Sequence, residues 1–228
     1  MDSIAEAGKY ILSQIGEGQR VGWGDGSTVR KLLESAGPEL REIEGLTFFT
    51  SSATTREWLV SGGFELGDIG KADHLHLYVD GCDQVDSELN ALKSGGGIHT
   101  REKLFASMAD QFILMGTEAK YVDHFDGKFP VVLEVIPDAA AFVTRKIREI
   151  YPASLLGIRQ QTNGSGPART ERGNLLVEMG LADWPELSGI NPELKKITGV
   201  LETSLFYGMA TKLILLGEEG IRMLERTP

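Results

Sequence analysis

Three carboxylates and one lysine lie close together along one stretch of this 228-residue chain, in an order that suits proton transfer at carbon. Asp80 and Asp83 belong to "VDGCDQVD", Lys93 precedes three glycines, and Glu102 belongs to "HTREK". Moving a proton between neighbouring carbons requires a base, a cation or hydrogen-bond donor for the developing oxyanion, and an acid for the adjacent oxygen. The stretch therefore predicts enolisation chemistry.

The expected backbone positions of these groups support that interpretation. Asp80 closes a predicted strand at 74–80, and Glu102 lies in the first turn of a predicted helix at 100–110. A helix dipole stabilises an ionised carboxylate in a first turn, as a general base requires, although the same placement also fits a glutamate that only complements the dipole. Two further carboxylates, Asp86 and Glu88, are typical of ordinary surface charge.

The elements around these residues alternate between strand and helix. The apolar pattern predicts strands at 20–22, 46–50, 74–80 and 111–116, separated by helices at 28–36, after 50 and at 100–110. This is the βαβ pattern of an open, largely parallel sheet, so the fold class is α/β with a Rossmann-like domain. Such sheets bind ligands at the carboxyl ends of their strands.

The pattern changes after residue 127 and predicts a second, smaller domain. A strand and a helix at 126–152 precede strands at 157–161 and 174–179 and a helix beginning at 191, with a polar turn at 162–173. We expect a smaller α+β, ferredoxin-like domain at 128–204. Residues 1–127 and 205–228 would form the catalytic domain, with an apolar strand at 205–217 rejoining its sheet.

Two polar loops follow predicted strands and precede predicted helices. "GWGDGST" (22–28) resembles the turns in which backbone N–H groups hold an anion, but Ser27 or Thr28 would also serve as a simple helix cap. Asp25 opposes anion binding, because a carboxylate repels phosphate. In "TSSATT" (50–55), serine and threonine are best explained as simple N-caps of the next helix.

Composition excludes several classes of partner. The net charge of −10, with no dense Lys/Arg cluster, argues against binding to nucleic acid or to an anionic membrane. A single cysteine rules out an intramolecular disulfide and suits a reducing compartment. The absence of a secretory pattern and of a long apolar run leads us to expect a cytoplasmic protein.

Other reactive or aromatic residues are best explained structurally. His74 and His76 alternate on one strand but have no third ligand at a suitable spacing, so no metal site is predicted. Cys82 is expected to pack, because nearby carboxylates disfavour a thiolate. Trp23 is expected to shape a pocket at the first polar loop. Four aromatic residues are expected in the core: Phe105, Phe112, Phe206 and Tyr207.

Six segments of the chain together resemble the type A ribose-5-phosphate isomerase family. They are "GWGDGST", "TSSATT", "YVDGCDQVD", "LKSGGGIHTREK", "KFPVVLEVIP" and "GVLETSLF", in the family's order over nearly the whole chain. The resemblance implies interconversion of ribose 5-phosphate and ribulose 5-phosphate through an enediolate, without metal or cofactor. It also implies a Rossmann-like domain, a smaller α+β domain and a homodimer or homotetramer.

By position, the resemblance implies roles for individual residues. Glu102 matches the general base, Asp80 and Asp83 match the aspartates of a D-G-A-D motif, and Lys93 matches the lysine that stabilises the enediolate. The positions that match substrate-binding ones are Asp25, Gly26, Ser27, Thr28, Gly81, Cys82, Ser94, Gly95, Gly96 and Lys120.

Departures from the family pattern gather around these positions. Asp25 replaces a hydroxyl in a loop that usually reads G-T-G-S-T, Cys82 replaces alanine and Ser94 replaces glycine. His99 replaces an apolar residue, and "TEAK" (117–120) and "TERGN" (170–174) also differ. Two alternatives therefore stay open: a catalytically weak sugar-phosphate sensor of the same fold, or an isomerase for a different sugar.

Overall fold

The computed structural model describes residues 2–226, and the chain folds into two compact units. Unit 1 comprises the chain up to Cys82, Arg101–Tyr121 and the chain from Gly208 on. Unit 2 comprises Asp83–Thr100 and Val122–Tyr207. Each unit has its own sheet and its own apolar core.

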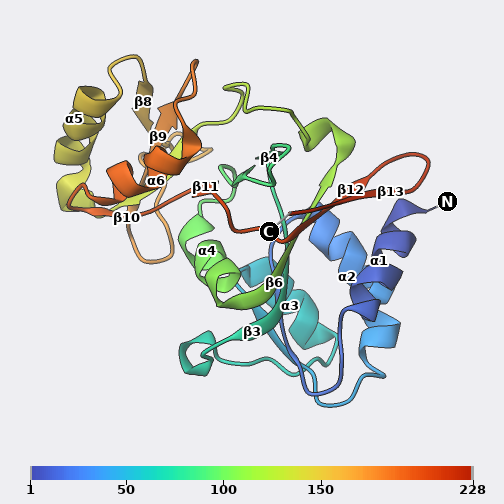
Figure 1. Cartoon of the computed structure of the whole chain (residues 1–228). Coiled ribbons are helices and arrows are strands. Elements are labelled where there is room, and N and C mark those ends of the chain that lie inside the picture. Colours follow the sequence, from blue (N-terminus) through green and yellow to red (C-terminus); the bar gives the residue numbers. More distant parts are fainter. Residues whose placement is uncertain (1, 227–228) are drawn as a thin grey trace. The chain divides into compact units, whose positions relative to one another are not determined.

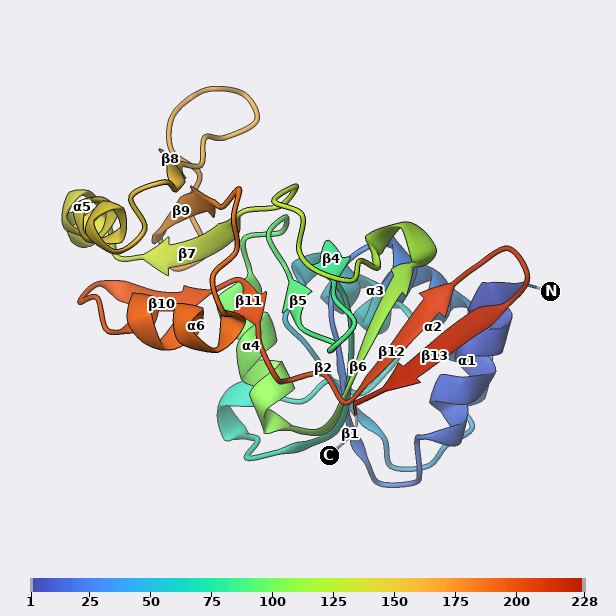
Figure 2. The same cartoon turned by 45° about the horizontal axis from the view of Figure 1, so that its top comes forward.

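Unit 1 is built on a six-stranded sheet in the order β13-β12-β6-β3-β1-β2 (Figure 1). All neighbouring strands are parallel except the edge hairpin β12–β13, which Figure 2 shows clearly. The predicted open, largely parallel sheet is thus confirmed. The strands are β1 (Arg20–Trp23), β2 (Thr47–Thr50), β3 (Leu75–Gly81), β6 (Ala109–Thr117), β12 (Lys212–Leu216) and β13 (Ile221–Glu225).

Side chains alternate along the strands of this sheet, so apolar side chains project from both faces. Helices cover both of these faces. Leu77 and Val79 of β3 share one core with the helices α1 (Ser3–Ser13), α2 (Ser27–Leu40) and α3 (Ala53–Ser61). Tyr78 points to the opposite face, where Phe105 of α4 (His99–Met108) lies 5.4 Å from it between ring centroids. Thus β3 is buried on both sides, as expected of a central parallel strand.

The parallel strands end close to one another along the sheet. In the strand register Trp23 pairs with Thr50 of β2 and with Val79 of β3, and Gly81 pairs with Met115 of β6. The segments that follow these strands therefore meet at the carboxyl edge of the sheet, where the polar loops were predicted to lie.

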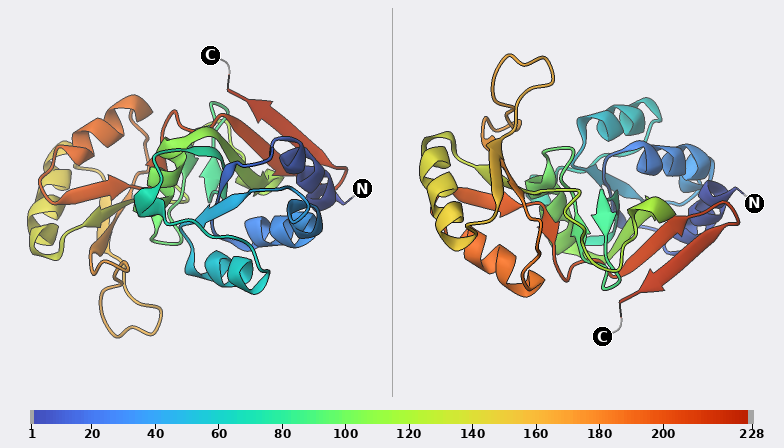
Figure 3. Two further views of the ribbon diagram at one scale, coloured as in Figure 1. Left: turned by 90° about the horizontal axis from the view of Figure 1, so that it is seen from below. Right: turned by 90° about the horizontal axis from the view of Figure 1, so that it is seen from above.

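Unit 2 contains an antiparallel four-stranded sheet in the order β10-β7-β9-β8. Its core is formed by alternate residues of β7, such as Leu133, together with apolar residues of two helices, such as Val143 and Leu194. The loop that follows β8 projects from this sheet in both views of Figure 3. The elements are β7 (Val131–Val135), α5 (Ala140–Ile150), β8 (Leu155–Ile158), β9 (Leu175–Gly180), α6 (Leu187–Lys195) and β10 (Val200–Thr203).

Unit 2 also holds a small three-stranded sheet that the sequence did not indicate. Its strands are β4 (Gln84–Val85), β5 (Ala91–Leu92) and β11 (Leu205–Phe206), paired antiparallel. The predicted strand at 205–217 is therefore wrong in part, because Leu205 and Phe206 join this small sheet and only Lys212–Leu216 joins the parallel one. None of the helices formed by residues 2–226 is long and apolar enough to cross a membrane.

Candidate active site

Asp80 is a fully buried carboxylate at the end of β3, with a relative exposure of 0%. Its Oδ1 accepts hydrogen bonds from the backbone N–H groups of Gly81 at 2.7 Å and Asp25 at 3.2 Å. Its Oδ2 accepts the phenol hydrogen of Tyr78 at 2.5 Å. Donors on both oxygens fix the plane of the carboxylate.

The first polar loop packs its backbone directly against Asp80. A Cβ atom at Gly24 would lie only 1.9 Å from Asp80 Oδ1, so only glycine fits there. Gly26 has a φ of 102° and precedes α2, and no side chain of the described residues caps this helix. The alternative in which Ser27 or Thr28 caps α2 is therefore wrong, and both side chains are at least partly exposed.

The second polar loop is joined to the first. The Ser52 hydroxyl accepts a hydrogen bond from Thr55 N at 3.1 Å, so Ser52 is the N-cap of α3, as expected for such a residue. The same hydroxyl donates to Asp25 Oδ1 at 2.6 Å, and the Thr55 hydroxyl donates to Gly24 O at 2.8 Å. These hydrogen bonds connect the loop that contains Gly24 and Asp25 to the first turn of α3.

Glu102 and Asp80 act electrostatically on the same buried phenol. Glu102 lies in the first turn of α4 with a relative exposure of 5%. Burial raises the pKa of Tyr78 well above its usual value, and the negative charges of Asp80 and Glu102 raise it further. Unit 1 thus brings two of the predicted catalytic carboxylates into one neighbourhood.

Lys120 and Cys82 also meet within unit 1. Lys120 ends the short helix η2 (Glu118–Lys120), and its ammonium donates to the carbonyl oxygen of Cys82. The Cys82 thiol is buried at the end of β3, near Gly116 of β6, in keeping with the expected packing role. Gly81 contributes the N–H that Asp80 accepts.

The remaining predicted residues belong to unit 2. Gly95 N donates to Asp83 Oδ2 at 2.8 Å, and the Ser94 hydroxyl donates to Pro130 O at 2.6 Å. Lys93 is buried, and its ammonium lies 5.9 Å from the centre of the Phe206 ring. Gly96 is exposed. Asp83 and the glycine segment thus come together in unit 2.

Arg159 binds the backbone of the segment Ser94–Gly97, and the sequence did not indicate this contact. Its guanidinium donates to the carbonyl oxygens of Ser94 at 2.6 Å and Gly95 at 2.9 Å, and it is held by Glu178 at 2.7 Å. Arg159 and the glycine segment are more than 60 residues apart in the chain, so local pattern contains no signal for this contact.

Several expectations are corrected. Asp86 is buried, not surface charge, because its carboxylate accepts from Glu88 N, Asn90 N and the Asn90 side chain and closes a tight turn. Tyr207 is 41% exposed and not part of the core. Trp23 is fully buried in the core of unit 1, where its ring packs beside that of Phe48.

The two histidines lie beside each other and contact Arg20. His76 Nδ1 accepts a hydrogen bond from Arg20 N at 3.0 Å, and the His74 ring lies 4.6 Å from the His76 ring. Among the described residues, no group of three or more His, Cys, Asp or Glu side chains is placed to hold a metal ion.

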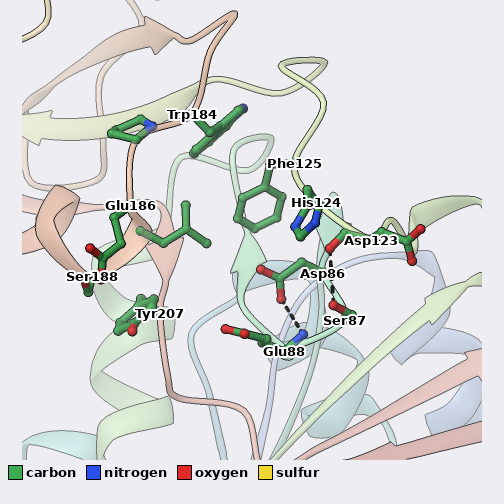
Figure 4. A pocket seen from close by; sticks show the side chains of 12 residues that line it. Asp86, Ser87, Glu88, Asp123, His124, Phe125, Trp184, Glu186, Ser188 and Tyr207 are labelled. Atoms are coloured by element: carbon green, nitrogen blue, oxygen red, sulfur yellow. Dashed lines mark hydrogen bonds between the residues drawn. The ribbon is translucent and has the colours of Figure 1, made fainter.

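A cavity of about 400 Å³ lies elsewhere in unit 2 (Figure 4). Its walls include four carboxylates and three aromatic rings, and none of the predicted site residues lines it. Since those carboxylates repel a phosphate, the cavity is unsuited to a sugar phosphate. The lining acidic and aromatic residues are Asp86, Glu88, Asp123, Glu186, Phe125, Trp184 and Tyr207.

An open parallel sheet with buried carboxylates at its carboxyl edge, joined to a smaller antiparallel α+β unit, defines a class of α/β enzyme that performs acid–base chemistry. The family model of ribose 5-phosphate isomerase A (phosphoriboisomerase A) matches residues 47–220. The chain belongs to the ribose 5-phosphate isomerase A family.

Individual relatives extend the match over nearly the whole chain. Ribose-5-phosphate isomerase A of Rhodopseudomonas palustris (strain BisB5) is 35% identical over 229 residues, covering 99% of this chain and 98% of that one. The crystal structure of ribose 5-phosphate isomerase A from Neisseria gonorrhoeae superposes with a TM-score of 0.87 at 28% identity, covering 99% and 96%. A D-ribose-5-phosphate isomerase in complex with phospho-erythronic acid superposes with a TM-score of 0.90 at 29% identity, covering 98% of each chain.

Proposed function

We propose that this protein interconverts D-ribose 5-phosphate and D-ribulose 5-phosphate through an enediolate. The observation that carries the proposal is the near-complete match to named isomerases, which includes the segments around Asp80, Lys93 and Glu102. One similar protein of known structure binds phospho-erythronic acid. The carboxylate of that acid resembles the two oxygens of an enediolate, so the comparison favours isomerisation over the sensor or an unphosphorylated sugar.

In the proposed reaction, two protons move and no atom is lost. Glu102 takes the proton from C2 of the open-chain aldose and returns it to C1. Asp80, with Asp83, assists transfer of the hydroxyl proton from O2 to O1, or assists ring opening. Lys93 stabilises the negative charge on the enediolate oxygens, as a cation does when charge develops.

Phosphate binding is proposed for the loop Asp25–Thr28, with Lys120 and residues 94–96 as further substrate contacts. Support comes from the start of α2, where no side chain of residues 2–226 caps the first turn, so its N–H groups and the helix dipole favour an anion.

Asp25→Thr tests the loop. It should tighten binding of ribose 5-phosphate if the carboxylate faces the phosphate, and an unchanged KM would mean that Ser52 holds it away.

The decisive experiment is a coupled assay of purified protein with ribose 5-phosphate, with and without EDTA. Because a positioned base contributes about 10²–10⁴-fold, Glu102→Gln should lose at least about 10²-fold in kcat while still binding sugar phosphate. Glu149→Gln is the matched control, since Glu149 lies on α5 and its carboxylate pairs with exposed Arg145 and Lys146. Near-normal turnover by Glu102→Gln would reject Glu102 as the base.

We also propose a homodimer or homotetramer in the cytoplasm. The family relation supports an assembly, and the single cysteine suits a reducing compartment. Light scattering of the purified protein gives the mass directly, and a monomer across the working concentration range would contradict the proposal.

A further inference from the structure

Tyr78 is a buried polar side chain that the proposed reaction does not use. It lies on β3 two residues before Asp80, so both side chains point to the same face of the sheet. Its hydroxyl donates to Asp80 Oδ2 at 2.5 Å, the short distance typical of a hydrogen bond to a charged acceptor. The phenol is thus part of the immediate surroundings of Asp80.

The Tyr78 ring is closely packed on several sides. Its centroid lies 5.4 Å from that of Phe105 on α4 and 5.2 Å from that of Phe112 on β6. A Cβ atom at Gly22 on the neighbouring strand would lie 2.8 Å from the ring. A donor locked on three sides by close packing keeps its direction.

The electrostatic surroundings keep the Tyr78 proton in place. Burial first, and then the charges of Asp80 and Glu102, raise the pKa of Tyr78 far above neutrality. Asp25 also lies next to Asp80, and its backbone N–H, not its carboxylate, faces Asp80. The phenol is therefore a hydrogen-bond donor throughout the working pH range.

We propose that Tyr78 is a positioning residue, which fixes the Asp80 carboxylate in the orientation that the isomerisation requires. Two backbone N–H groups hold Oδ1, and the phenol holds Oδ2. Removing the hydroxyl loosens one side of the carboxylate without emptying the ring's place in the core. The proposal rests on the proposed role of Asp80.

The test is Tyr78→Phe, which keeps the ring and removes only the hydroxyl. We expect kcat to fall by about 10-fold and KM to change less than about 2-fold, since loss of orientation affects the transition state more than binding. Tyr151→Phe is the matched control, since it also removes a phenol that donates to a carboxylate at 2.5 Å, that of Glu193 in unit 2, and it should leave both quantities unchanged.

Asp80→Asn and the double variant separate the possible failures. If Tyr78 acts through Asp80, Tyr78→Phe should cost much less in the Asp80→Asn background than in the native protein. Full turnover by Tyr78→Phe while Asp80→Asn is inactive would overturn the positioning role alone. Full turnover by Asp80→Asn would instead overturn the proposed role of Asp80. Equal losses from Tyr78→Phe in both backgrounds would assign the tyrosine to stability only.

Discussion

Asp80 in unit 1 and Glu134 in unit 2 are both buried carboxylates that accept several hydrogen bonds, but their donors differ in kind. Asp80 accepts from two backbone N–H groups and a phenol at the end of a parallel strand. Glu134, 4% exposed, accepts from the side chains of Thr100, Thr170 at 2.9 Å and Asn174 at 2.8 Å in the middle of β7.

The two sets of donors have different structural effects: one orients the carboxylate itself, and the other holds chain segments together. The backbone donors of Asp80 come from the strand ends at the ligand-binding edge, so they orient the acid itself. The side-chain donors of Glu134 come from the first turn of α4 and from the segment before β9, so the carboxylate ties those segments to β7. We expect removal of the first charge to reduce activity and removal of the second to reduce stability.

Asp80→Asn should produce the largest effect. An asparagine keeps the size of the side chain and one acceptor oxygen, while the charge and the capacity to move a proton are lost. We expect kcat to fall by at least about 10²-fold, together with a loss of about 1–2 kcal/mol in the free energy of unfolding, because the amide leaves one buried donor without its acceptor. A coupled assay and an unfolding curve, measured on the same preparation, give kcat and the free energy of unfolding. A variant that loses stability but keeps its specific activity would contradict a catalytic role for Asp80.

Glu134→Gln should lose stability without the loss of turnover expected of Asp80→Asn. The amide cannot accept all three hydrogen bonds, and a buried donor left without its acceptor is costly, so we expect a loss of about 2 kcal/mol in the free energy of unfolding. Turnover of the folded fraction should stay far above that of Asp80→Asn. The exposed Glu149→Gln is the control, and an equal loss of stability there would remove the special status of Glu134.

The stability of the native protein should depend on pH through Glu134. Burial alone raises the pKa of Glu134, but its hydrogen bonds outweigh burial and leave the pKa below its usual value. A lowered folded-state pKa stabilises the fold above the usual range of a glutamate, and this contribution is lost as the pH falls through that range. Unfolding free energies measured from about pH 6 to about pH 3 should fall less steeply in Glu134→Gln than in the native protein. Parallel curves would contradict this assignment.

Ser52→Ala should produce the smallest effect. It removes the N-cap of α3 and the hydrogen bond to Asp25, which should cost about 1 kcal/mol of stability. The backbone N–H of Asp25 still reaches Asp80, so kcat should change little. Ser61→Ala, which removes a hydroxyl that donates to Trp58 O in the last turn of the same helix, is the control. A large fall in kcat would show that the side chain of Asp25 matters to Asp80.

Local patterns explain which parts of this structure the sequence predicts. The alternation of apolar strands and helices predicts that Asp80 and the first polar loop lie at one edge of a sheet. This prediction needs only the pattern of neighbouring residues. Tyr78 could also have been found, since residues two apart on a strand share a face. The donors to Glu134 lie 34 to 40 residues away, and no local pattern indicates them.

Element ends and short strands depend on packing that the sequence alone does not reveal. The predicted helix at 28–36 continues to Leu40 through Gly37 and Pro38, because Ala36 and Leu40 are buried in the core of unit 1. The strands β4, β5 and β11 have two residues each, too few for an alternation to be recognised, and their pairing joins distant segments.

The hydrogen bond from Asp25 to Asp80 affects how the loop tolerates mutation. The group that contacts Asp80 is the backbone N–H, which every standard amino acid except proline possesses. Saturation mutagenesis of position 25 should therefore spare the geometry of Asp80 in every variant except proline. At position 24, where a Cβ atom would displace the carboxylate, the same scan should accept glycine alone. Positions 24 and 25 thus differ sharply in the substitutions that they tolerate, although both contact Asp80.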